Sequence, residues 1–230
     1  MSHLFAFLQY LLPHHALSRF IAMFAETALF RKALIKAFIG FYKVDMSEAL
    51  LSDLDQFENF NAFFTRELKP DARPLVEGES TVVCPADGVI SQAGAIEKNS
   101  LLQAKGRVFK VADLLGDDSA LVDDFSACTF ATIYLSPRDY HRVHMPLAGR
   151  LEKMIYVPGR LFSVNQRMSG YVPNLLARNE RVICLFQTQA GPMALVLIGA
   201  MIIAGIETVW SGQVCPSPRT RKLQVMSYET

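Results

Sequence analysis

Two short stretches of the sequence concentrate groups that move protons or bind anions. Residues 85–88 carry Asp87, and residues 136–146 carry His141 and His144 together with two arginines, an aspartate and a tyrosine. Imidazoles exchange protons near neutral pH, and guanidinium groups hold carboxylates and phosphates. This density of reactive groups, in a chain that is 51% hydrophobic, predicts a functional site.

Three roles compete for the two histidines. The first is a shared metal ion on a helix, which the spacing allows; Pro146 and the lack of a third ligand motif weigh against it. The second is a histidine that acts as base towards a hydroxyl nucleophile, with Asp87 orienting its ring. The third is a hydrogen-bonded structural histidine. An Asp-Gly pair after a strand is also common as a plain turn. From the residues alone these alternatives stay open.

The first 45 residues are expected to be helical. Apolar residues recur at helical spacing in residues 4–12, 17–24 and 34–42, and this region has a net charge of +3. Such helices suit a region that lies on an anionic bilayer, and they equally suit a subdomain that packs its apolar side on the rest of the protein. Periodicity does not separate the two.

From about residue 80 the pattern predicts a β-rich body, a barrel or a sandwich. Strands are expected at 82–84, 89–90, 129–135, 151–157, 182–186 and 193–203, and a short helix at 111–115. The uncharged stretch 182–206 is interrupted by turn residues at 187–192, which favours two buried strands over a membrane helix. We therefore expect an α+β fold, with segments 1–48 (helical, membrane-associating), 49–80 (connector) and 81–230 (β-rich catalytic body).

Composition narrows the class of protein further. A net charge of +1 and 51% hydrophobic residues exclude a disordered chain and argue against a nucleic-acid partner. The four cysteines form no C-x-x-C pair, so we expect reduced, mostly buried thiols and no structural zinc. No secretory signal is evident in the first residues.

The chain resembles the bacterial-type phosphatidylserine decarboxylases, which depend on a pyruvoyl group. The Tyr-His-Arg-Val-His-Met-Pro block within residues 134–146 is the most specific part of the resemblance. The stretches that carry it are Tyr42–Met46, Phe60–Arg66, Pro85–Ser91, Tyr134–Pro146, Tyr156–Gly159, Phe162–Asn165, Asn179–Arg181 and Glu207–Trp210.

The resemblance implies a self-cleaving precursor. A serine hydroxyl attacks the preceding glycine carbonyl, and the resulting ester eliminates and hydrolyses to leave a pyruvoyl group. His144 matches the base of that step and Asp87 matches the residue that orients it. The pyruvoyl carbonyl then forms a Schiff base with phosphatidylserine and takes up electrons as carbon dioxide leaves. His141 matches a histidine near the substrate, as proton donor or carboxylate partner. No metal is implied.

The resemblance also implies partners and a location. The expected partners are a small pyruvoyl-bearing chain cut from the same precursor, phosphatidylserine, an anionic membrane surface and, as an option, a second copy of the chain. The expected location is peripheral, on the cytoplasmic face of the cell membrane. In that light the membrane-contacting alternative for the first helices becomes the favoured one.

One departure from the family pattern is visible. None of the thirteen glycines is followed by serine, so the serine that yields the pyruvoyl group is expected beyond Thr230. We thus expect the sequence to represent the large-chain region, with a C-terminally incomplete β body and no activity on its own. Two alternatives remain, a non-catalytic membrane-associated scaffold of the same fold and a β-rich metal-dependent hydrolase that uses His141 and His144.

Overall fold

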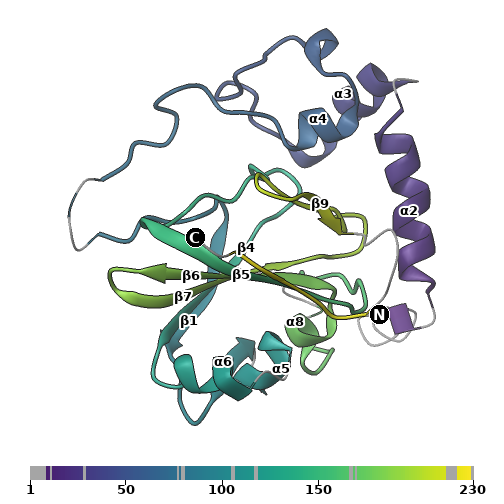
Figure 1. Cartoon of the computed structure of the whole chain (residues 1–230). Helices are drawn as coiled ribbons and strands as arrows, with labels where there is room; N and C mark the ends of the chain where they lie inside the picture. The colour runs from purple at the N-terminus through teal and green to yellow at the C-terminus, as the bar shows by residue number, and fades with distance from the viewer. Residues whose placement is uncertain are drawn as a thin grey trace. The chain divides into compact units, whose positions relative to one another are not determined.

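The computed structural model describes residues 9–10, 12–27, 30–76, 78, 81–104, 107–116, 119–165, 168, 170–215 and 222–228. The chain forms two compact units, each built from separate stretches (Figure 1). The sheet unit comprises residues up to Ser18, Ile90–Thr132 and residues from Ala148 on, and the helical unit comprises Arg19–Val89 and Ile133–Leu147. The segments predicted from composition divide the chain differently and stay predictions.

An antiparallel four-stranded sheet is the centre of the sheet unit. Its strand order is β10 (Gln224–Ser227), β5 (Gly149–Val157), β6 (Arg181–Thr188) and β7 (Gly191–Ile198). Strands β6 and β7 form a hairpin whose register pairs Thr188 with Gly191. The turn falls within the polar residues that interrupt the uncharged stretch 182–206, so the prediction of two strands there is confirmed.

This sheet is covered on both faces, which explains why its strands are so apolar. Val182 and Cys184 of β6 pack on one side with Ile206 of β8 (Ile206–Thr208) and Cys215 of β9 (Gly212–Cys215). Ile183 of β6 packs on the other side, where the covering elements are β2, β3, α5 and α6 (Figure 1). These elements span Ser100–Ala104, Arg107–Lys110, Val111–Leu115 and Ser119–Asp124. The helix predicted at 111–115 is therefore present.

The α+β class is confirmed. Of the two architectures expected for the β-rich body, a barrel or a sandwich, the described residues do not form a closed barrel. The described strands outside the four-stranded sheet form three two-stranded sheets. In these, β1 (Val89–Ala95) pairs with β4 (Thr129–Tyr134), β2 pairs with β3, and β8 pairs with β9. The four-stranded sheet ends at β10 and β7 and does not close on itself. The strand predicted at 82–84 is also absent, because Val83 donates to the carbonyl of Pro146 and proline has no N–H to return the bond.

Aromatic packing organises the helical unit. Helix α3 (Arg31–Tyr42), the 3-10 turn η1 (Leu54–Gln56) and helix α4 (Phe60–Phe64) enclose a core in which Ile35, Phe57 and Phe63 are buried. Helix α2 (His14–Ala25) starts in the sheet unit and ends in the helical unit. The helices predicted at 17–24 and 34–42 are confirmed, and most of the one at 4–12 lies outside the described residues.

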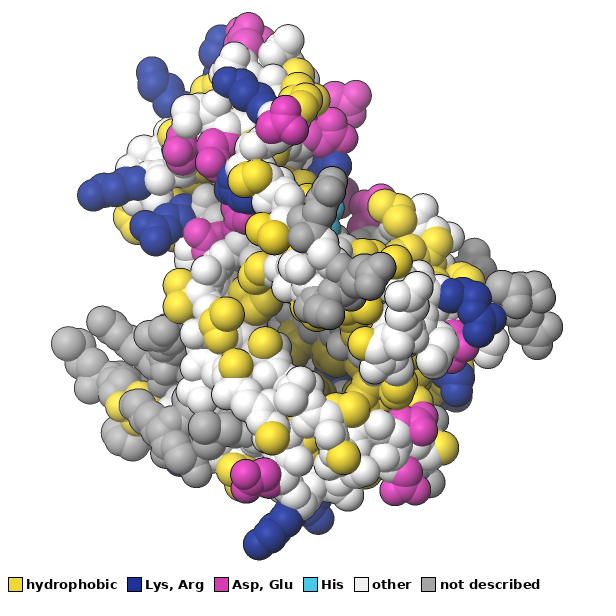
Figure 2. All heavy atoms as spheres, turned by 90° about the vertical axis from the view of Figure 1, so that its left-hand side faces the viewer, with side chains coloured by type: hydrophobic (Ala, Val, Ile, Leu, Met, Phe, Trp, Pro, Cys, Tyr) yellow, Lys and Arg dark blue, Asp and Glu magenta, His cyan; other side chains and the backbone are white. Residues whose placement is uncertain are grey.

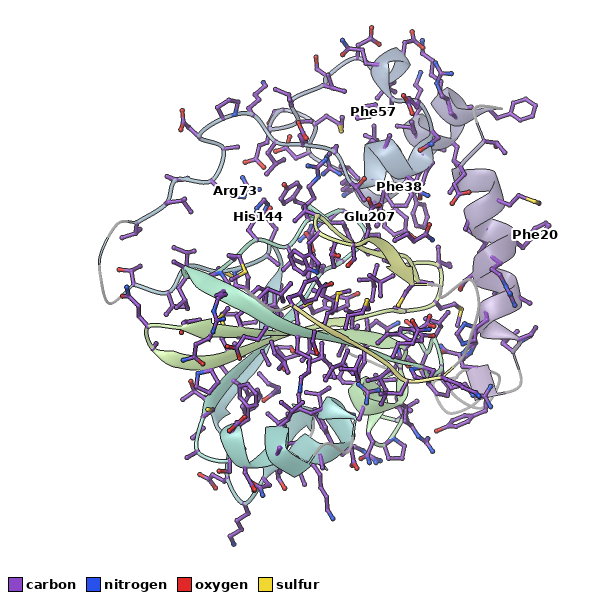
Figure 3. All side chains as sticks on the ribbon, in the orientation of Figure 1. Phe20, Phe38, Phe57, Arg73, His144 and Glu207 are labelled. Carbon is purple, nitrogen blue, oxygen red and sulfur yellow. The ribbon has the colours of Figure 1, made fainter. Side chains whose placement is uncertain are left out.

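Helices α2 and α3 also expose apolar side chains. Phe20 and Met23 of α2 are 57% and 56% exposed, and Figure 3 shows Phe20 projecting away from its helix. Phe41 of α3 is 79% exposed. No described helix combines the length and apolar character that crossing a bilayer requires.

The cysteines are less uniform than expected. Cys184 and Cys215 are buried, and burial raises the pKa of the Cys184 thiol to about 11. Cys128 is half-buried, and Cys84 is exposed because its segment forms no strand. The expectation of mostly buried thiols thus holds for the two in the β-rich core.

Candidate functional site

Backbone hydrogen bonds join the two stretches that the sequence singled out. The N–H of His144 donates to the carbonyl of Pro85 at 2.7 Å, and that of Val83 donates to the carbonyl of Pro146 at 2.9 Å. Both contacts lie within the helical unit. The tertiary structure therefore places Asp87 and His144 near each other, although 57 residues separate them in the sequence.

The Asp-Gly pair lies where two backbone segments approach each other closely. Gly88 has a φ of +145°, and a Cβ atom there would lie 2.4 Å from the carbonyl oxygen of Tyr134. Only glycine combines that backbone conformation with so close an approach. The glycine thus fixes the path of the chain directly after Asp87.

Arg73 binds the carboxylate of Asp87. Its Nε donates to Oδ1 at 2.9 Å and to Oδ2 at 3.1 Å, and its Nη2 also contacts Oδ2. The same guanidinium donates to both carboxylate oxygens of Glu48, at 2.9 and 2.8 Å. The hydrogen bonds from Arg73 hold the pKa of Asp87 below its usual range. Asp87 is therefore a stable anion.

His144 is exposed and has a hydroxyl partner. Its Nε2 lies 3.0 Å from the hydroxyl oxygen of Tyr140, and the two rings are stacked. No hydrogen bond joins Asp87 to His144 within the described residues, but the charge of His144 contributes to the lowered pKa of Asp87. Figure 3 shows Arg73 and His144 in the same region of the helical unit.

His141 differs from His144 in its surroundings. Its ring lies 4.0 Å from that of Phe64, and its Nδ1 donates to the carbonyl of Asp139 at 2.8 Å. Burial lowers the pKa of His141. The imidazole is thus neutral near pH 7, with its proton on Nδ1 and a free electron pair on Nε2.

A polar cleft of about 240 Å³ is lined by Asp87 and Tyr140, although neither His141 nor His144 is part of the lining. Figure 2 shows positive and negative side chains intermingled over the part of the molecule that carries α3 and α4. The cleft has four cationic and four acidic residues in its lining, which comprises Lys43, Asp45, Glu48, Arg66, Leu68, Arg73, Asp87, Arg138, Asp139 and Tyr140.

Arg66 is the unusual member of this lining. It is 5% exposed, yet its side chain forms no hydrogen bond or ion pair with the described residues. Its guanidinium carbon lies 5.5 Å from the centre of the Phe63 ring, and burial lowers its pKa. The charges of Asp45, Asp87 and Glu48 act on it, but none of these carboxylates forms a hydrogen bond with it. A buried cation without a hydrogen-bonded anion is costly. Its position in the cleft therefore points to an anionic ligand.

Sequence reasoning assigned no role to Arg66, Arg73 or Tyr140. Arg73 and Glu48 lie 14 and 39 residues before Asp87, and no local pattern connects the three. Tyr140 stood inside the histidine motif, and Arg66 stood at the end of a stretch that supported the family resemblance. These positions in the sequence were the only signals from which a role for Tyr140 or Arg66 could have been inferred. Among the described residues, no group of three or more potential ligands could hold a metal ion.

Comparison with known proteins decides the family. A family model described as phosphatidylserine decarboxylase matches residues 60–226, and a second, described as PSD, matches residues 4–43. The chain belongs to the phosphatidylserine decarboxylase family. The resemblance inferred from the motifs is thereby confirmed, and the family places the chain among the carboxy-lyases.

The relatives in this family are precursors by name. The chain is similar to the phosphatidylserine decarboxylase proenzyme of Pseudomonas putida strain W619, with 59% identity over 223 residues, 96% of this chain and 78% of that protein. It is also similar to the proenzyme of Pseudomonas aeruginosa strain PAO1, with 59% identity over 221 residues, 95% of this chain and 76% of that protein. The proenzyme of Pseudomonas entomophila strain L48 is 58% identical over 223 residues. Asp87, His141 and His144 all fall within the part that the family model matches.

Proposed function

We propose that this protein is the precursor of a phosphatidylserine decarboxylase, which converts phosphatidylserine to phosphatidylethanolamine and carbon dioxide. The observation that carries the proposal is the convergence of Asp87, His141 and His144 in one unit of a chain that belongs to this family. The cleft that Asp87 lines has groups of both charges, which suits a headgroup that contains an ammonium, a carboxylate and a phosphate.

In the self-cleavage step, His144 would accept a proton from the serine hydroxyl. Its exposed ring is accessible to such a segment, and its Nε2 already engages a hydroxyl oxygen, that of Tyr140. Asp87 remains ionised through Arg73 and supplies a negative charge near the ring. The pair is thus suited to turn a serine hydroxyl into a nucleophile.

These residues fit a pyruvoyl group, because generating one requires a base for a hydroxyl and His144 is placed as one. The group, when present, supplies the electron-withdrawing carbonyl that allows the substrate carboxylate to leave. The small pyruvoyl-bearing chain would come from the same precursor, in agreement with the proenzyme names of the relatives.

His141 would act first as a general base and then as a general acid towards the substrate. Because its Nδ1 proton is bonded to Asp139, its Nε2 can accept a proton from the substrate ammonium and so free the amine. The ring can return that proton to the carbon that loses carbon dioxide. Because the His141 ring is neutral before the reaction, it must accept a proton first. It can act as the expected proton donor only after that step, once carbon dioxide has left.

The test separates the two histidines. The protein is expressed from its complete reading frame, and intact mass records cleavage while release of labelled carbon dioxide from carboxyl-labelled phosphatidylserine records activity. His144→Ala should stay a single uncut chain. His141→Asn should be cut normally but lose at least about 100-fold in activity, the usual contribution of a general acid or base. Arg107→Gln, on an exposed strand of the sheet unit, is the control. Normal cleavage by His144→Ala, or full activity of His141→Asn, would contradict the assignment.

We further propose a peripheral location on the cytoplasmic face of the cell membrane. Support comes from exposed Phe20, Met23 and Phe41 and from the net charge of +3 over residues 1–45. Flotation with vesicles that contain phosphatidylglycerol should retain the protein, and Phe20→Ser with Met23→Ser should weaken retention. Equal retention would refute a contact through α2. A homodimer stays a prediction, which light scattering in detergent tests.

A further inference from the structure

A second pocket lies in the sheet unit and shares no residue with the cleft around Asp87. It has a volume of about 480 Å³ and is lined by Tyr10, His15, Gly159, Arg160, Phe162 and Arg178. The lining comes from the segment around the start of α2, from the loop after β5 and from α8 (Leu175–Arg178). All of these residues belong to the sheet unit.

Two guanidinium groups give the pocket a positive charge. The side chain of Arg160 forms no hydrogen bond or ion pair with the described residues. Arg178 donates from Nη1 to the Tyr10 hydroxyl at 3.0 Å and lies 5.9 Å from the centre of that ring. Neither guanidinium is paired with a carboxylate in the part of the chain that the structure describes. An arginine pair of this kind is suited to bind phosphate.

Buried polar atoms without hydrogen-bond partners lie behind the lining of the pocket, on residues that contact Phe162 and His15 or precede Tyr10. Oε2 of Glu180 and Nε2 of His14 and of Gln9 find no hydrogen-bond partner in the described part, although each residue is 2% exposed or less. The His14 ring packs edge-on against Phe162 in the wall, and Glu180 Oε2 lies 4.0 Å from Nδ1 of His15. Unsatisfied buried groups are rare in proteins and commonly meet a ligand or ordered water.

The walls indicate what kind of molecule the phosphate belongs to. The rings of Tyr10 and Phe162 lie 4.9 Å apart and form an apolar part of the lining. The two guanidinium groups form the charged part. The volume exceeds what a carboxylate or a phosphate ion alone would fill. We propose that this pocket binds the phosphate of an ester that also has an apolar part, as in the headgroup of an anionic lipid, whatever alcohol that headgroup carries.

Binding at this pocket does not depend on the decarboxylation reaction. The probes therefore carry no serine headgroup and cannot be substrates of that reaction. The protein from the complete reading frame is titrated with inorganic phosphate and is floated with vesicles of phosphatidylcholine with and without phosphatidylglycerol. The pocket variant is Arg160→Gln with Arg178→Gln. The control is Arg107→Gln with Lys110→Gln, which removes the same charge from exposed positions of β3 in the same unit.

The pocket variant should bind about tenfold more weakly to at least one probe, while the control stays within about twofold of the unaltered protein. Loss of vesicle binding assigns a lipid phosphate, and loss of inorganic phosphate binding alone assigns a soluble ligand. Arg160→Lys with Arg178→Lys, which keeps the charge, should recover part of the lost affinity and shows that the Gln variant failed for lack of charge rather than of fold. Equal binding by pocket variant and control, or no binding of either probe by the unaltered protein, would overturn the proposal.

Discussion

At the scale of single residues, Arg66 is the clearest sign that the cleft serves a ligand. A buried guanidinium without a hydrogen-bonded anion does not stabilise a fold, and a well-packed apolar side chain often does better in its place. Proteins keep such a group where binding requires it. The stacking of the group on Phe63 holds it in position without neutralising it.

This gives a prediction with opposite effects on stability and on binding. Arg66→Met should leave the free energy of unfolding unchanged or raise it by about 1 kcal/mol. The same change should raise KM for phosphatidylserine about tenfold or more, because a charge-assisted contact to the anionic headgroup is lost. Urea unfolding and initial rates on mixed micelles measure the two quantities. A destabilised variant with an unaltered KM would show that Arg66 is structural.

At the scale of elements, the start of β1 positions the site. Gly88 passes against the carbonyl of Tyr134 at the end of β4, so the strand pair and Asp87 are fixed by the same close approach. A side chain at this point would have to displace backbone rather than a flexible side chain. The candidate relay residue is therefore held by the contact between Gly88 and Tyr134, which both lie in the helical unit.

Two glycines of the same segment make a matched pair. Gly88→Ala should cost about 2–3 kcal/mol of unfolding free energy, because it combines a positive φ with a clash. It should also slow self-cleavage by moving Asp87. Gly94→Ala, in β1 with nothing within 4 Å of its Cβ position, should change stability by less than about 1 kcal/mol. Thermal unfolding and cleavage rates compare the two, and similar values for both variants would refute the role of the close approach at Gly88.

At the scale of the whole molecule, buried histidines link stability to pH. Burial lowers the pKa of both His14, in the sheet unit, and His141, in the helical unit. Arg160 and His15 act in the same direction on His14, and Arg66 does so on His141. Each histidine is therefore protonated more readily in the unfolded chain than in the folded protein.

The sign of the pH effect follows. Below the unfolded-state pKa of about 6.5, these histidines bind protons in the unfolded chain but not in the folded protein. The free energy of unfolding therefore decreases as the pH falls below that value. Each unit of pKa difference is worth about 1.4 kcal/mol. Urea midpoints should decline between about pH 7.5 and 5.5, and His14→Gln or His141→Gln should flatten the decline. A midpoint that rises on acidification would contradict the burial of these rings.

The sequence by itself determined the elements and the family. Apolar runs predicted β6 and β7 because both faces of that sheet are buried, and a run broken only by Glu152 and Lys153 predicted β5. Helical spacing predicted α2 and α3. The histidine motif identified the reactive stretch. These features depend on local patterns, which a chain displays before it folds.

Only the tertiary structure decided which groups meet. The carboxylate of Asp87 binds Arg73 and is influenced by the charge of His144, and Arg66 forms no hydrogen bond or ion pair with the described residues. The described strands remain open sheets instead of a barrel. The ion pairs of Arg73 join residues 14 and 25 positions apart, so they depend on where loops cross. A sheet closes only if its edge strands meet in register. No short stretch of sequence indicates these ion pairs or the closure of a sheet, because both arise from the packing of distant segments.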